Sequence, residues 1–210
     1  MMRVDSLSAQ ADRSGRYMVK FSDGTVMRLY RQTVEDFALY TGMELDCSQL
    51  DALRDAAGQM SAKMRAVRIV AASSVSKEDL EQRLIQKGEN KKQAREAVLW
   101  MEEMALVDDR ETARQIVRRG AAKGYGCARV KQMLYEKRIP KELWDEALDE
   151  FPDQTDKMVD FLKTRLTEAW DQKELKRAID ALLRRGHAYS EIRKALQQLQ
   201  MDMEDFPEEQ

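Results

Sequence analysis

The sequence predicts a mainly α-helical protein, a tandem array of three three-helix repeats preceded by a small α+β segment with a β-hairpin. An apolar residue, a turn residue and a second apolar residue recur at offsets of 50 and then 48 residues: Leu84, Gly88 and Ala97; Leu134, Arg138 and Ala147; Leu182, Gly186 and Ala195. The composition agrees, with 43% hydrophobic and 35% charged residues but only 9 Gly and 3 Pro. This balance is typical of a folded, helix-rich chain. A repeat of this length predicts units that bury their apolar faces by stacking.

The N-terminal segment, residues 1–58, is predicted to contain the hairpin. Tyr17–Phe21 and Thr25–Tyr30 are rich in aromatic and branched residues, and Ser22-Asp23-Gly24 joins them. Asp-Gly between two such runs is a strong hairpin signal, because the turn needs residues that adopt positive φ. Since two strands alone are marginally stable, we expect the hairpin to pack on helices or on a third strand.

Capping patterns predict two short helices after the hairpin. Thr33 precedes an apolar run and opens a helix over residues 34–40, which stops at Gly42. Ser48 opens another short helix, which ends at Gly58.

Helix signals divide the rest of the chain into repeats over residues 59–107, 108–152 and 153–201 and an acidic tail over 202–210. Polar residues that suit helix N-caps stand before the apolar runs at Ser76, Asn90 and Asp108. The third repeat is predicted to contain helices over about 156–169, 172–185 and 190–200. The three tryptophans suit core positions: Trp100, Trp144 and Trp170.

The sequence contains no convincing catalytic, cofactor or metal site. Gly124-Tyr125-Gly126 lacks the third glycine and the preceding strand of a dinucleotide site, and it is no P-loop. His187 is the only histidine and is predicted to be a partly exposed structural residue of a turn. Cys47 and Cys127 are too few and too distant to indicate a disulfide framework or a metal site. The pair Asp108-Asp109 fits helix capping better than a carboxylate dyad. We therefore expect a non-enzyme without a cofactor or a small-molecule substrate.

The sequence also predicts no segment for export or membrane insertion. No apolar run approaches the roughly 20 residues of a helical membrane span. Residues 1–10 lack the apolar centre of a signal peptide. We expect a cytoplasmic protein with no membrane partner.

Basic residues concentrate in repeats two and three, although the formal net charge of the chain is −2. Residues 111–145 contain nine Lys and Arg against four Asp and Glu, and residues 173–194 contain seven against three. Bases interleaved with aromatics suit phosphate contact and base stacking, or docking onto an acidic protein groove. Solvated helix faces are the alternative interpretation. The candidate contact residues are Arg118, Arg119, Lys123, Tyr125, Arg129, Lys131, Lys137, Arg138, Lys176, Arg177, Arg184, Arg185, Tyr189, Arg193 and Lys194.

Several short motifs resemble, in their order, those of the RecX family, regulators of the RecA recombinase. They are Val107-Asp108-Asp109; Gly126 with Arg129, Leu134 and Lys137; Leu183-Arg184-Arg185-Gly186 with Tyr189; and Ile192-Arg193-Lys194-Ala195-Leu196. The resemblance covers about residues 61–200 and implies an elongated, curved array of three-helix units. Departures from the family pattern are Ala72-Ser73-Ser74 in place of bases, Cys127 in place of proline, Arg138 in place of glycine and His187 in place of an aromatic. The missing bases lead us to expect the contact surface in repeats two and three.

The resemblance implies a non-enzymatic regulator that binds RecA filaments on single-stranded DNA. We expect a monomer that inhibits RecA's ATPase, recombinase and coprotease activities and that contacts DNA weakly or through RecA. A DNA-binding helical regulator that acts without RecA is the main alternative, and strong, salt-dependent DNA affinity would indicate it. A plain helical scaffold with solvated charges is the third possibility.

Overall fold

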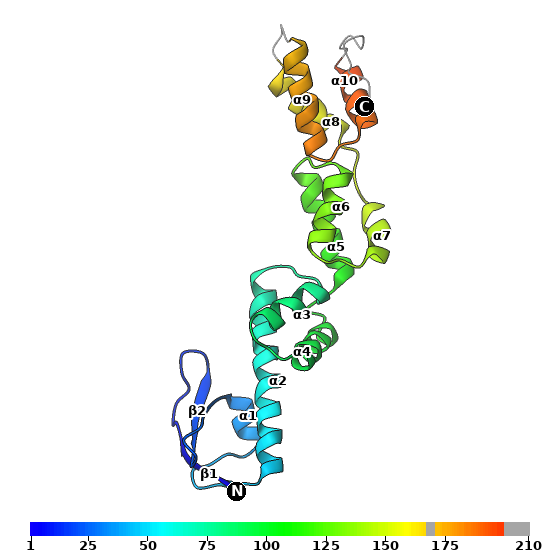
Figure 1. The fold of residues 1–210 in the computed structure, drawn as a ribbon. Coiled ribbons are helices and arrows are strands. Elements are labelled where there is room, and N and C mark those ends of the chain that lie inside the picture. The colour runs from blue at the N-terminus through cyan, green and yellow to red at the C-terminus, as the bar shows by residue number, and fades with distance from the viewer. Residues whose placement is uncertain (167–170, 200–210) are drawn as a thin grey trace. The chain divides into compact units, whose positions relative to one another are not determined.

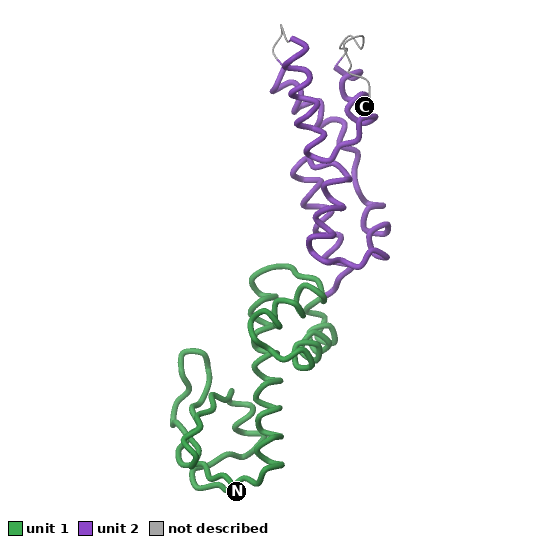
Figure 2. Tube along the Cα trace, in the orientation of Figure 1, with its two compact units in different colours: residues 1–107 green, residues 108–210 purple. Residues whose placement is uncertain are grey.

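The computed structural model describes residues 1–166 and 171–199, and the chain divides into two compact units, residues 1–107 and 108–210 (Figures 1 and 2). The fold class predicted from the sequence is confirmed: the described residues are mainly helical, with one small antiparallel sheet near the N-terminus. Trp170 and the predicted acidic tail lie outside the described residues. The division into an N-terminal segment, three repeats and a tail stays a prediction.

The sheet of the first unit has four antiparallel strands in the order β3-β2-β1-β4. The strands are β1 (Met2–Leu7), β2 (Arg16–Phe21), β3 (Val26–Tyr30) and β4 (Glu44–Leu45). The predicted hairpin is confirmed as β2–β3, and Gly24 in its turn has a φ of +85°. A third strand was one of the two partners expected for the hairpin, and β1, which pairs with β2, is that strand; β4 was not predicted. They complete the sheet that buries Val4, Phe21 and Leu29.

The first predicted helix is wrong in its bounds, because helix α1 (Arg31–Asp36) begins directly after β3. Tyr30 occupies its N-cap position without a side-chain hydrogen bond. Thr33, the predicted cap, is instead buried inside the helix at 2% exposure. Ala38 has a φ of +45°, so the chain has already left the helix there.

The second predicted helix is also wrong in its bounds, because helix α2 runs without a break over 26 residues (Cys47–Ala72). Its capping box uses Asp46 and Gln49, so Ser48 is not the cap. Gly58 does not end the helix. A Cβ atom at Gly58 would lie 2.1 Å from the amide nitrogen of Gln93, so the glycine leaves room for a side chain of helix α4.

The continuous helix α2 contributes to two hydrophobic clusters of the first unit. Leu50 and Leu53 pack with the sheet, whereas Ala62 and Ala66 pack with α3 (Lys77–Gln86) and α4 (Lys91–Glu103). Ser76 and Asn90 cap α3 and α4 through their side chains, as predicted.

The second unit contains two groups of helices, each with its own hydrophobic cluster. The first group is α5 (Asp109–Ala122), α6 (Cys127–Glu136), the 3₁₀ turn η1 (Lys141–Leu143) and α7 (Trp144–Leu148). The second group is α8 (Thr155–Arg165), α9 (Gln172–Arg184) and α10 (Tyr189–Gln198). Asp108 caps α5, accepting a hydrogen bond of 2.8 Å from the Arg110 backbone N–H. The capping interpretation of the aspartate pair is therefore confirmed.

The internal repeat is visible in the backbone after α3, α6 and α9. Gly88, Arg138 and Gly186 occupy the same turn position, with φ values of +90°, +52° and +86°. In each turn the next residue donates its N–H to the carbonyl of the repeated leucine, over 3.1, 3.0 and 3.3 Å. Arg138 thus adopts the left-handed conformation that glycine takes in the other two turns.

Two tryptophans pack at the edges of the clusters and are only partly buried, so the predicted core role holds in part. The Trp144 indole N–H donates to the Ile139 carbonyl over 3.0 Å. The Lys63 ammonium lies 5.3 Å from the centre of a Trp100 ring, a cation–π geometry. Both cysteines are free thiols.

Candidate interaction surface

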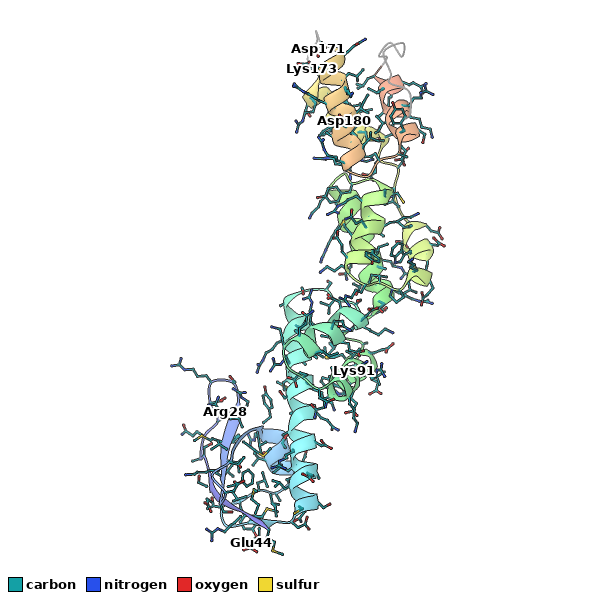
Figure 3. All side chains as sticks on the ribbon, in the orientation of Figure 1. Arg28, Glu44, Lys91, Asp171, Lys173 and Asp180 are labelled. Atoms are coloured by element: carbon teal, nitrogen blue, oxygen red, sulfur yellow. The ribbon has the colours of Figure 1, made fainter. Side chains whose placement is uncertain are left out.

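Helix α9 presents a stripe of basic side chains to solvent. The spacing of Lys173, Lys176, Arg177, Asp180 and Arg184 places all five on one helix face. Lys176, Arg177 and Arg184 are exposed, and the opposite face is buried in the cluster of α8–α10. Figure 3 labels Lys173 and Asp180 on this helix; Asp180 is the single acid in the stripe. Among the described residues, Lys176, Arg177 and Arg184 have no ion-pair partner.

Helix α10 adds two further exposed candidates, Arg193 and Lys194. The carboxylate of Asp153 has a lowered pKa, chiefly because it accepts hydrogen bonds from Thr155, and Lys194 contributes to the shift. Tyr189 is half-buried and packs against the cluster of α8–α10, so its ring is partly committed to the fold.

The candidates of α5 and α6 fall into paired and unpaired groups. Arg118 lies 2.6 Å from Glu111, and Arg129 lies 3.3 Å from Glu136, so carboxylates partly neutralise both. Arg119, Lys123 and Lys131 are exposed, and none has an ion-pair partner within the part of the chain that the structure describes.

Three candidates lie at turns. Lys137 is a half-buried C-cap residue of α6, and Arg138 is exposed in the left-handed turn that follows. Tyr125, in the turn between α5 and α6, is half-buried against the cluster of α5–α7.

The turn between α5 and α6 packs tightly on the turn between α9 and α10, and we call this contact the glycine junction. The backbone N–H of Gly126 donates to the Arg185 carbonyl over 2.9 Å, and that of Ala128 donates to the Gly186 carbonyl over 3.2 Å. A Cβ atom at Gly126 would lie 2.2 Å from the Gly186 carbonyl oxygen. Only glycine therefore fits at Gly126 without a backbone shift.

Arg185 is part of the glycine junction and less available than the stripe on α9. Its guanidinium carbon lies 4.8 Å from the centre of the Phe161 ring. On the same ring, the Arg165 guanidinium carbon lies 5.3 Å from the centre. Lys157 on α8 donates to the Ala121 carbonyl at the end of α5. Contacts within the second unit therefore engage Arg185 on the Phe161 ring and Lys157 at the end of α5.

His187 is buried, with 4% of its surface exposed, so the predicted partial exposure is wrong. The reason is the glycine junction, which covers the turn. Its Nε2 lies 3.0 Å from the Gly124 carbonyl oxygen, and because a carbonyl only accepts, Nε2 carries the hydrogen. Burial lowers the pKa of His187 below its ordinary value of 6.5. The neutral imidazole is therefore a structural group of the junction.

Among residues 1–166 and 171–199, no three His, Cys, Asp or Glu side chains gather closely enough to hold a metal ion. No helix in these ranges is both long and apolar enough to cross a membrane.

Comparison with known proteins finds relatives of this chain. Residues 108–148, which form α5 to α7, match the family described as RecX, second three-helix domain. The chain is 28% identical over 140 residues to the "Regulatory protein RecX" of Vibrio parahaemolyticus, covering 65% of this chain and 90% of that protein. The protein of the same name from Vibrio vulnificus is also 28% identical, with 92% of it covered. The chain is therefore similar to regulatory RecX proteins, and residues 108–148 match one domain of that family.

Two solved structures of RecX proteins share the fold. One, described as regulatory protein RecX, superposes with a TM-score of 0.65 at 20% identity and covers 92% of this chain and 100% of its own. The other, RecX from Lactobacillus salivarius, gives a TM-score of 0.61 at 18% identity and covers 69% and 98%. The family resemblance stated from the short motifs is therefore confirmed.

The sequence reasoning missed a group of basic residues in the first unit. Arg65 and Arg68 on α2, with Arg83 and Lys87 at the end of α3, line one pocket of about 480 Å³. The missing RecX-type bases at Ala72–Ser74 suggested that this repeat had no such surface. The signal lay in the i, i+3 spacing of Arg65 and Arg68, which the continuous helix α2 directs to one side.

Proposed function

We propose that this chain binds RecA filaments on single-stranded DNA and inhibits RecA's ATPase, recombinase and coprotease activities. The observation that carries the proposal is the similarity to regulatory RecX proteins over 140 residues. Similarity to this family favours a protein partner, and the RecX family is one of RecA regulators, so we infer that the partner is RecA.

The contact surface we propose is the basic stripe of α9, extended by the exposed bases of α10, α5 and α6. Exposed cations without carboxylate partners attract an acidic protein surface or DNA phosphates from a distance and speed association. Contacts from several helices act together on one filament, so each contact raises the effective concentration of the next. We expect binding to weaken as salt rises, because screening shortens the range of these charges.

The proposed activity needs no catalytic group. The Vibrio relatives are named regulatory proteins, and the candidate residues are bases on helix faces rather than a nucleophile with a general base. The chain would act as a monomer by occupying filament surface, and sedimentation equilibrium measures its oligomeric state.

Co-sedimentation with RecA filaments on single-stranded DNA tests the surface. The test variant is Lys176→Glu/Arg177→Glu/Arg184→Glu. The matched control is Lys91→Glu/Lys92→Glu/Arg95→Glu, which reverses three exposed bases on α4; Lys91 is labelled in Figure 3. We expect the wild type and the control to sediment with the filament and the α9 variant to stay in solution.

Two other outcomes would change the proposal. If the wild type stays in solution at micromolar concentration, filament binding is wrong. If it binds single-stranded DNA equally well with and without RecA and leaves RecA's ATPase unchanged, the direct DNA-binding alternative replaces it.

A further inference from the structure

The pocket in the first unit brings together bases from two helices that the sequence reasoning did not connect. Arg65, Arg68, Arg83 and Lys87 line it with the apolar side chains of Ile69 and Ala72. Ser73, where α2 ends, adds a hydroxyl group. Its volume of about 480 Å³ lies within the usual range for small-ligand pockets, roughly 300–1,000 Å³.

Two of the four cations are held in place by carboxylates. Arg65 lies 2.7 Å from Glu89 through its Nε, and its guanidinium also donates to the Lys87 carbonyl over 2.8 Å. Arg83 lies 2.9 Å from Asp79. These contacts fix both guanidinium groups before any ligand arrives, and they neutralise two of the four charges.

The other two cations remain uncompensated. Arg68 donates to the neutral hydroxyl of Tyr30 over 3.2 Å, and Lys87 has no ion-pair partner among the described residues. The pocket and its two carboxylates therefore carry a charge of +2. Helix capping is the alternative role for these bases. It explains Arg65, which donates to the Lys87 carbonyl at the negative C-terminal end of α3. It does not explain Arg68, which donates to a tyrosine hydroxyl rather than to a helix end.

We propose that this pocket binds the phosphate group of a nucleotide, and that single-stranded DNA supplies it. Arg68 and Lys87 each have donors for a phosphate oxygen, and Ile69 and Ala72 provide an apolar surface for the sugar or base. A carboxylate ligand would use the charges but not that surface. The RecX pattern has basic residues where this chain has Ala72, Ser73 and Ser74. Basic side chains of α2 and α3 line the pocket beside this segment. Only the choice of DNA as the source rests on the proposed function; the phosphate site does not.

Fluorescence anisotropy of a labelled oligothymidylate, measured with the full chain and without RecA, tests the site. The test variant is Arg68→Ala/Lys87→Ala. The control, Lys91→Ala/Arg95→Ala, removes one lysine and one arginine from the exposed face of α4. We expect the Kd of the test variant to rise about tenfold, and the salt dependence of log K to become shallower by about 0.7 for each phosphate that the variant no longer neutralises. The control should stay within about twofold of wild type.

Folding and the source of the phosphate are tested separately. Arg68 and Lys87 are exposed, so the test variant should unfold at the same urea concentration as wild type. If oligothymidylate binds both variants equally but ADP binds only the control, the phosphate site stands and DNA is wrong as its source. If neither probe distinguishes the variants, the site is wrong. Because RecA is absent, this failure would leave the proposed filament binding untouched.

Discussion

The turn after α3 and the turn after α9 have the same backbone conformation, but their surroundings differ. Gly88 and Gly186 have φ values of +90° and +86°, and both turns bond back to a buried leucine. A Cβ atom at Gly186 would lie 2.3 Å from the Arg129 backbone nitrogen, whereas none of the described residues places an atom within 4 Å of that position at Gly88. The recurring leucine and glycine therefore give both turns the same backbone, whereas packing in the glycine junction distinguishes the turn after α9 from the turn after α3.

The largest effect that separates the two turns is expected from adding one methyl group. Gly88→Ala should cost about 1 to 2 kcal/mol of unfolding free energy, because a residue other than glycine is strained in the left-handed conformation. Gly186→Ala should cost about 1 to 3 kcal/mol more, because the Cβ also meets the backbone of α6. Urea unfolding followed by circular dichroism measures both.

Gly126→Ala isolates the packing part of that difference. Gly126 has a φ of −79°, which any residue adopts, so its substitution adds a clash without left-handed strain. We expect a loss of about 1 to 3 kcal/mol. A variant as stable as wild type would show that the glycine junction contributes nothing.

A middle-sized effect is expected at the corresponding turn after α6, where Arg138 has a φ of +52°. Arg138→Gly relieves the left-handed strain and should raise the unfolding free energy by about 1 kcal/mol. Losing the interactions of the arginine side chain reduces this gain. The same unfolding measurement tests this. A loss of stability would mean that those interactions outweigh the backbone strain.

The smallest expected effect is a pH dependence that only the packed turn has. The pKa of His187 is lowered in the folded state, so the unfolded chain binds the proton first as pH falls. The unfolding free energy should therefore decrease below pH 6.5 and reach a constant loss below the folded-state pKa. His187→Gln keeps an N–H donor for the Gly124 carbonyl, and it should remove this part of the pH dependence. Equal pH profiles for the two proteins would contradict the assignment.

Local signals predicted most of the helices, because their caps and apolar spacing are encoded within a few residues. Ser76, Asn90 and Asp108 cap the helices they were expected to cap. The errors arose where a distant partner decides the outcome. Gly58 indicates a helix end by itself, but it lies opposite Gln93, which is 35 residues further along the chain.

The candidate surface was predictable in its composition but not in its availability. Arg184 and Arg185 are neighbours in sequence, yet one is exposed on α9 and the other stacks on Phe161. His187 is hidden because Gly124 and Gly126 allow two turns to meet. The i, i+3 spacing of Arg65 and Arg68 indicates one side of the basic pocket, but Lys87 joins them only because α2 and α3 pack against each other.

The most direct test of the central claim is RecA-catalysed ATP hydrolysis on single-stranded DNA, with this chain titrated at substoichiometric amounts. We predict that the wild type and the α4 reversal Lys91→Glu/Lys92→Glu/Arg95→Glu lower the rate. The α9 reversal Lys176→Glu/Arg177→Glu/Arg184→Glu should leave the rate unchanged. A wild-type chain without effect would contradict regulation of RecA. Equal inhibition by the two variants would contradict α9 as the contact surface.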